Sequence, residues 1–140
     1  MADPIELGRR LSKNKHFQWK PGMVAMRVDP PEFFSEGADP YRLVGQKYLV
    51  ILVRAQSVQC YGECFRTHHP AYVPDVTDPG TRGHLLERLR EVWGTPSGIL
   101  APLDKGRWAW KVPDILRSVA VTLRGDSEAE ALTLAFEGVP

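Results

Sequence analysis

The chain has 140 residues, of which 43% are hydrophobic and 25% are charged, proportions typical of one soluble globular domain or of two small ones sharing a core. A formal net charge of +1 excludes a global attraction to nucleic acid or anionic membrane, and two cysteines are too few for a disulfide scaffold. The first ten residues do not resemble a signal peptide, and the longest apolar run, 48–53, is far shorter than the roughly 20 residues of a membrane span. We therefore expect a cytoplasmic protein with free thiols, no cofactor and no membrane partner.

The N-terminal segment predicts a short helix followed by a strand. Ile5, Leu7 and Leu11 stand at partly helical spacing among basic residues, although Gly8 weakens the helix that they predict. A Pro-Gly turn comes next, and residues 24–28 then alternate in the pattern of a half-buried strand.

The next segments predict a small curved sheet. Three prolines and a glycine indicate a loop at 29–40, and the apolar run within 41–56 is typical of a central strand. Residues 57–65 alternate again, as a further strand or a hairpin, and the prolines of 67–80 mark a boundary between two halves. For residues 1–76 we predict a mostly antiparallel curved sheet, such as an SH3-like barrel.

The second half, 77–140, begins with a strong helix signal. Thr77 or Asp78 can cap a helix that has Pro79 at its first position and stops at Gly94. The leucines that follow fall on one face of this helix.

Three strands and a last helix complete this half. Asp126 or Ser127 can cap the last helix, and acidic residues occupy its first turn, where the helix dipole favours them. The fold class that we predict is α+β, with a C-terminal α-β-β-β-α unit in which two helices pack on one face of an antiparallel sheet. The strands are expected at 97–101, 106–112 and 118–124.

The stretch QCYGECFRTHH holds both cysteines and two of the four histidines. Zinc needs three or four convergent N or S ligands, and Cys60, Cys64, His68 and His69 are weak candidates for them. In a continuous strand the two cysteines would share one face and lie about 13 Å apart, too far for a common metal or a disulfide. They would meet only if the residues between them form a tight turn. We favour a structural role and predict no metal.

A catalytic role for these residues is less favoured still. A cysteine nucleophile needs a nearby imidazolium or a helix N-terminus, and neither Cys60 nor Cys64 opens a predicted helix. The chain also contains no G-x-S-x-G, P-loop or G-x-G-x-x-G motif. The sequence predicts a protein that is not an enzyme, with a zinc or thiol enzyme as the least favoured alternative.

An acidic segment with two phenylalanines is a candidate protein-binding site. Phe33 and Phe34 are bracketed by Glu32 and Glu36, and aromatic anchors ringed by polar groups carry much of the energy of protein interfaces. Alternatively, the two rings fold down and close the end of the barrel.

A basic cluster near the N-terminus is the candidate nucleic-acid site. It contains Arg9, Arg10, Lys13 and Lys15, and its alternative role is that of a solvated helix face. Trp108 and Trp110 share one face of a predicted strand, where they serve either as a stacking platform for bases or as core residues; the core role is favoured.

The second half resembles small phage and prophage proteins of unknown function. These carry a proline-aspartate lead-in, a D-P-x-T helix start, an L-L-x-x-L-R-E-x-W-G helix and a closing E-A-E-A-L helix, and their C-terminal part resembles the phage ABA sandwich domain. The resemblance implies a fold and a mobile-element origin, and it carries no catalytic residues. The matching residues are Pro74, Asp75, Asp78, Pro79, Thr81, Leu85, Leu86, Leu89, Arg90, Glu91, Trp93, Gly94, Glu128, Ala129, Glu130, Ala131 and Leu132.

These observations lead to three functional hypotheses. The first is a non-enzymatic, phage-encoded accessory protein of the bacterial cytoplasm that binds a host or phage protein, an inhibitor of host defence being one example. The second is a nucleic-acid-binding module that uses the basic N-terminal segment. The third is the zinc or thiol enzyme. Small sheets with exposed edges often pair, so a homodimer is one of the arrangements that the sequence allows.

Overall fold

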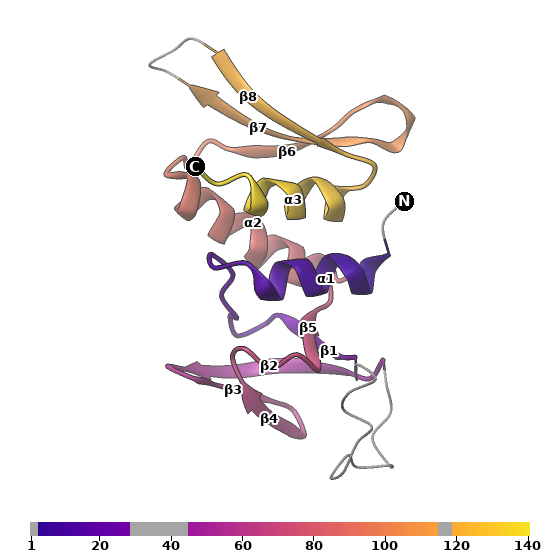
Figure 1. The fold of residues 1–140 in the computed structure, drawn as a ribbon, viewed down its shortest axis with the longest axis vertical. Coiled ribbons are helices and arrows are strands. Elements are labelled where there is room, and N and C mark those ends of the chain that lie inside the picture. The colour runs from indigo at the N-terminus through magenta and orange to yellow at the C-terminus, as the bar shows by residue number, and fades with distance from the viewer. Residues whose placement is uncertain (1–2, 29–44, 115–118) are drawn as a thin grey trace.

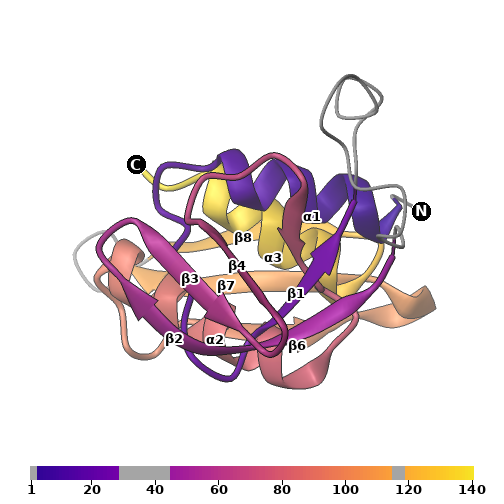
Figure 2. The ribbon, with the colours of Figure 1, turned by 90° about the horizontal axis from the view of Figure 1, so that it is seen from below.

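The structure, a computed structural model, describes residues 3–28, 45–114 and 119–140. Three helices form a layer between two antiparallel sheets (Figure 1). One sheet has five strands in the order β4-β3-β2-β1-β5, and the other has three in the order β6-β7-β8. Viewed from the side of the five-stranded sheet, β2, β3 and β4 curl in front of the helices (Figure 2).

The first helix, α1 (Pro4–Lys13), forms where the leucine spacing predicts it. The Asp3 carboxylate caps it by accepting a hydrogen bond from the backbone N–H of Ile5 at 3.2 Å. Gly8 weakens the helix locally but allows close packing, because a Cβ at this position would lie 2.8 Å from the carbonyl oxygen of Pro74. The glycine therefore lets α1 lie directly against strand β5.

The five-stranded sheet is built from short strands and two turns. Strand β2 is its central strand, as the apolar run of the sequence predicts, and it pairs with β1 on one side and β3 on the other. Strands β4 and β5 form the two edges. The strands are β1 (Val24–Arg27), β2 (Lys47–Arg54), β3 (Ser57–Cys60), β4 (Glu63–Arg66) and β5 (Tyr72–Pro74).

Burial within this sheet differs from the pattern that alternation predicts. Strand β1 is not half-buried, because Ala25 and Arg27 on one face are as buried as Met26 on the other. In strand β2 the alternation is clear on one stretch. Val50 is buried, whereas its neighbours Leu49 and Ile51 are each 53% exposed. The helices cover β1 and β5 but leave the outer face of β2 open.

Helix α2 (Pro79–Trp93) begins and ends at the predicted residues. The Asp78 carboxylate caps it, accepting from the Thr81 N–H at 2.8 Å, and Gly94 ends it in the left-handed conformation with φ of 66°. The predicted N-terminal Pro and C-terminal Gly signals are thus confirmed.

The second sheet contains β6 (Ile99–Pro102), β7 (Trp108–Asp114) and β8 (Val119–Gly125), with a short 3₁₀ turn at Asp104–Gly106. Helix α3 (Glu128–Glu137), capped by Ser127, packs on this sheet and also touches α1 and α2. Helix α2 reaches the sheet near its C-terminal end, where Trp93 and Trp110 lie 6.3 Å apart between ring centroids. Trp110 is fully buried, which confirms a core role for this residue.

One hydrophobic cluster joins the described elements. It includes Leu7 and Leu11 of α1, Val50 of β2, Trp110 of β7 and Phe136 of α3. The structure is therefore α+β, with a curled antiparallel five-stranded sheet and a second sheet of three strands. The division at residues 76 and 77 stays a prediction.

Candidate functional site

The cysteine stretch forms a hairpin, so the prediction of a continuous strand through both cysteines is wrong. Gly62 has φ of +82° and turns the chain between β3 and β4, a conformation that glycine adopts without strain. The pairing register sets Cys60 opposite Glu63 and Cys64 opposite Gln59. Residues one step apart point to opposite faces of a sheet, so Cys60 is buried and Cys64 is exposed. Of the two alternatives for residues 57–65, a further strand or a hairpin, the structure has the hairpin, and the two cysteines do not share one face.

The buried thiol of Cys60 is poorly suited to act as a nucleophile. Burial, with smaller contributions from Cys64 and Glu63, raises the pKa of Cys60 to about 11, so that this thiol stays protonated at neutral pH. His68 is exposed, whereas His69 packs edge-on against Tyr72 and accepts a hydrogen bond from the Ala71 N–H. Within the described ranges no three of the His, Cys, Asp and Glu side chains come together as metal ligands.

The residues of the predicted basic cluster take different places in the fold. Arg10 forms a two-point ion pair with Glu137 of α3, and this hydrogen bond raises the pKa of Arg10. Arg9 is half-buried and Lys13 exposed, while Lys15 lies beyond the helix and borders a cavity. The predicted protein-binding residues Glu32, Phe33, Phe34 and Glu36 lie outside the described residues.

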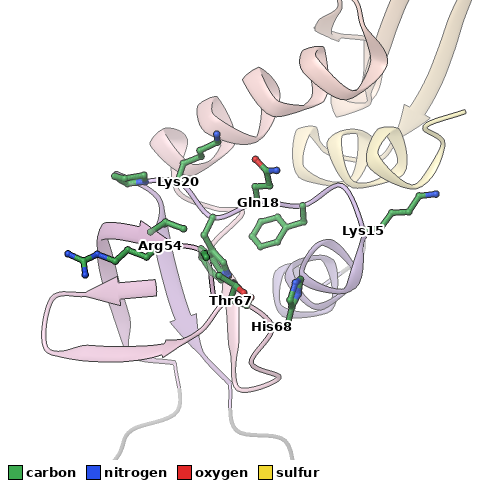
Figure 3. A pocket seen from close by; sticks show the side chains of 11 residues that line it. Lys15, Gln18, Lys20, Arg54, Thr67 and His68 are labelled. Atoms are coloured by element: carbon green, nitrogen blue, oxygen red, sulfur yellow. Dashed lines mark hydrogen bonds between the residues drawn. The ribbon is translucent and has the colours of Figure 1, made fainter. Parts of the chain in front are cut away.

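The cavity that Lys15 borders is the candidate site (Figure 3). Its volume is about 600 Å³, and it lies between the segment that follows α1, the end of β2 and the residues that follow β4. Four of its eleven lining residues are basic and none is acidic. The lining residues are Lys15, Phe17, Gln18, Trp19, Lys20, Pro21, Val53, Arg54, Ala55, Thr67 and His68.

Hydrogen bonds hold the segment along this cavity in an extended form. The Trp19 indole N–H donates to the Thr67 carbonyl at 3.1 Å, which ties the segment to the end of β4. On the other side, the Arg88 guanidinium of α2 donates to the His16 carbonyl at 2.9 Å. A turn follows, in which Gly22 adopts φ of +94° and its N–H donates to the Val50 carbonyl.

A row of aromatic rings supports the cavity from inside. Phe17 meets Trp19 edge to face at 5.1 Å, Trp19 meets Phe65 at 5.5 Å, and Phe65 stacks on Tyr72 at 4.0 Å between centroids. Phe17 and Trp19 are 5% and 4% exposed, so they are wall residues and not open stacking platforms.

The basic side chains around the cavity do not converge on one point. Lys15, Lys20, Arg54 and His68 lie on different sides of it (Figure 3). Among the residues that the structure describes, no carboxylate forms an ion pair with Lys15, Lys20 or Arg54. Spread, unpaired cations suit an extended polyanion better than a small anion, which several converging donors would hold.

Sequence reasoning found only part of this site. Lys15 belongs to the predicted basic cluster and His68 is a weak candidate metal ligand, but no sequence signal points to Arg54 or Thr67. One available signal was the run KHFQWK, in which buried Phe17 and Trp19 alternate with the outward Gln18 and Lys20. That alternation indicates an extended basic edge over an apolar wall. The contribution of Arg54, 34 residues after Lys20, follows only from the tertiary fold.

Comparison of the chain with models of known protein families, with curated proteins and with solved structures finds no match. The resemblance to phage proteins and to the ABA sandwich domain therefore stays a prediction. Every helix in the described ranges is too short or too polar to cross a lipid bilayer.

Proposed function

We propose that the protein is a non-enzymatic binding protein that holds the phosphate backbone of a nucleic acid at the basic cavity. The observation that carries this proposal is a cavity lined by two lysines, one arginine and one histidine and by no acidic residue, with Lys15, Lys20 and Arg54 unpaired in the described chain. Phosphate contacts by lysine and arginine release counterions and supply most of the affinity of non-specific binding.

The geometry favours backbone contacts over base recognition. The aromatic side chains of the cavity wall are buried, so they offer no face on which a base could stack. Binding of this kind is expected to be weakly dependent on sequence and strongly dependent on salt.

The test is the anisotropy of fluorescent single-stranded and duplex DNA and RNA oligonucleotides, titrated with protein at several salt concentrations. The variant Lys20→Glu/Arg54→Glu should bind more than about tenfold more weakly, and its salt slope should fall by about 2, one for each lost phosphate contact. The matched control, Lys105→Glu/Arg124→Glu, makes the same charge change at exposed positions near the other sheet. It should bind like wild type. Failure of the wild type to bind any oligonucleotide at ~50 mM salt would refute the proposal.

A second proposal is that the protein binds a host or phage protein, as the sequence predicts. The observation in its favour is the exposure of Leu49, Ile51 and Tyr61 on the five-stranded sheet. A phage origin, a role against host defence, a cytoplasmic location and homodimerisation belong to this proposal. So do the finer fold assignments, the SH3-like barrel and the ABA-type sandwich. Affinity capture with wild type and Phe33→Ala/Phe34→Ala tests the segment that the sequence singles out.

A further inference from the structure

The outer face of strands β2–β4 carries a row of uncovered apolar side chains. Leu49 and Ile51 are each 53% exposed, on the opposite side of β2 from the buried Val50. The register with β3 shifts between Val50 and Leu52, as at a β-bulge. This shift places Leu52, paired with the exposed Gln59, on the outer face as well. We name Leu49, Ile51, Leu52 and Tyr61 the apolar row.

Tyr61 extends the row at the β3–β4 turn. It is 78% exposed, and its backbone N–H donates to the Leu49 carbonyl at 3.0 Å, so the two residues are neighbours. In Figure 2 the strands β2, β3 and β4 face the viewer, and no described helix or strand lies over them.

The two ends of the apolar row differ in charge. At one end Lys47 pairs with the Asp75 carboxylate at 2.9 Å, and Asp78 lines the same hollow as Lys47 and Leu49. At the other end stand Arg54 and the exposed Arg66, joined through the register Arg54–Ser57–Arg66. The one carboxylate in residues 45–74 is Glu63, which points to the inner side. There it accepts a hydrogen bond from the Tyr72 hydroxyl and lies 3.5 Å from the Arg27 guanidinium. At the Arg54–Arg66 end, the described outer face therefore combines apolar side chains with cations.

We infer that the outer face of β2–β4 is a docking surface for a protein segment that is both acidic and apolar. This inference deepens the second proposal, that of a protein partner, and shares only Arg54 with the cavity of the nucleic-acid proposal. Apolar anchors supply the contact area, while the surrounding cations attract carboxylates and disfavour basic partners. Aliphatic side chains form most of the row and cannot stack on bases, so the face fits a protein better than a nucleic acid.

A defined peptide tests the inference. The probe is a 20-residue peptide with leucine at helical spacing and glutamate elsewhere. Two comparison peptides carry lysine in place of every glutamate, or serine in place of every leucine. Binding is followed through the backbone amide signals of the ¹⁵N-labelled full chain. The Glu/Leu peptide should shift the amides of Leu49, Ile51 and Tyr61 and bind at least about tenfold more tightly than either comparison peptide.

Two variants and a control complete the test. Leu49→Ser/Ile51→Ser and Arg66→Glu should each weaken binding of the Glu/Leu peptide by about tenfold or more. Ile99→Ser should leave it unchanged, because Ile99 is 47% exposed but belongs to the other sheet. Circular dichroism of each variant establishes that it is folded.

Several outcomes would overturn the inference. If the lysine peptide binds as tightly as the Glu/Leu peptide, the claim that the partner is acidic is refuted. If the Glu/Leu peptide does not shift these amides, the claim that this face is a docking surface is refuted. If an oligonucleotide shifts the same amides in the wild type and no longer binds Leu49→Ser/Ile51→Ser, the face would be assigned to nucleic acid. If the wild type sediments as a dimer and Ile51→Ser sediments as a monomer, the face would be assigned to contact with a second copy of the chain. Since Lys20 is not varied, failure here leaves the nucleic-acid proposal standing.

Discussion

The N-terminal and C-terminal parts of the molecule differ in how their charges are arranged. Counted along the sequence, residues 1–76 hold ten basic and eight acidic side chains, an even balance. Four of those eight acids fall in residues 29–39, outside the described chain. Asp75 forms an ion pair with Lys47, and Glu63 forms one with Arg27. The described surface of this part is therefore largely cationic. In residues 77–140 acids and bases are mixed, as in the pair Arg88–Glu91.

The comparison teaches that a near-zero net charge does not exclude a binding surface of one sign. Net charge is a sum over the chain, whereas a partner meets only the groups on one face. The C-terminal part, with caps at predicted positions and a buried Trp110, supplies the scaffold. The N-terminal part supplies both candidate surfaces. Five experiments test the two parts and the contacts between them.

The largest effect is expected from Trp110→Ala. This side chain is fully buried in the cluster that contains residues of both parts, and such a truncation costs about 3 to 5 kcal/mol. Urea unfolding followed by circular dichroism should show a single transition, with its midpoint at a lower urea concentration than in the wild type. The thiol of Cys60, in the other part, should become reactive in the same transition. A Cys60 that stays protected after the C-terminal part has unfolded would show that the parts are independent.

A smaller loss is expected from Asp75→Ala, which cuts the link between the sheet and the start of α2. The Asp75 carboxylate accepts from the Thr77 N–H and hydroxyl at 3.1 and 2.6 Å and pairs with Lys47 at 2.9 Å. Three such bonds contribute about 2 to 3 kcal/mol to the free energy of unfolding. Denaturant titration measures the loss, and Lys47→Met, which keeps the Thr77 bonds, should lose less.

The same residue makes stability depend on pH. Burial alone would raise the pKa of Asp75, but the bonds from Thr77 and Lys47 outweigh burial and lower it. A lowered folded pKa contributes stability that is present above the unfolded carboxyl value of about 3.9 and is lost as the pH falls through the folded value. Unfolding of wild type should therefore become easier below about pH 4, and Asp75→Asn should show a flatter profile. Identical profiles would contradict this account.

Two glycines in helices should respond to alanine with opposite signs. At Gly8 a Cβ would lie 2.8 Å from the Pro74 carbonyl oxygen and 3.0 Å from Val73, so α1 would have to move and stability should fall by about 1 to 2 kcal/mol. At Gly83 of α2 a Cβ meets nothing within 4 Å, and alanine should add up to about 1 kcal/mol. Melting temperatures give both signs. A stabilising Gly8→Ala would show that α1 does not press on β5 as described.

The smallest change is a chemical one and leaves stability unaltered. Cys64 is exposed, whereas Cys60 is buried and its pKa is raised from 9.0 to about 11. Near neutral pH the thiolate fraction of Cys60 is therefore roughly 100-fold smaller than that of a thiol with a pKa of 9.0. An aromatic disulfide reagent at about pH 8 should titrate one thiol in the native protein and two in denaturant. Loss of the native signal in Cys64→Ser identifies the reactive residue, and equal reactivity of both thiols would contradict the hairpin.

Much of the fold was predictable because its signals are local. Helix α2 begins at Pro79 and ends at Gly94 because these residues favour the required backbone conformations wherever they stand. Ser127 caps α3 through its own side chain, which is also a local effect. The three strands of the second sheet also fall where alternation and turns indicate them. By contrast, the exposure of Leu49 and the burial of Arg27 were not predictable, since alternation shows that two faces differ but not which one a distant helix covers.

The sequence by itself determined the fold class, the helix boundaries and the absence of a convincing metal or nucleophile pattern. These depend on residue types and on neighbours a few positions apart. Only the tertiary structure decided that Cys60 and Cys64 point to opposite faces, that Arg54 joins Lys15 and Lys20 around one cavity, and that no described helix or strand covers the apolar row on β2. Each of these depends on how layers far apart in the chain pack together. That packing reflects the burial of the whole apolar core and not the preference of any one segment.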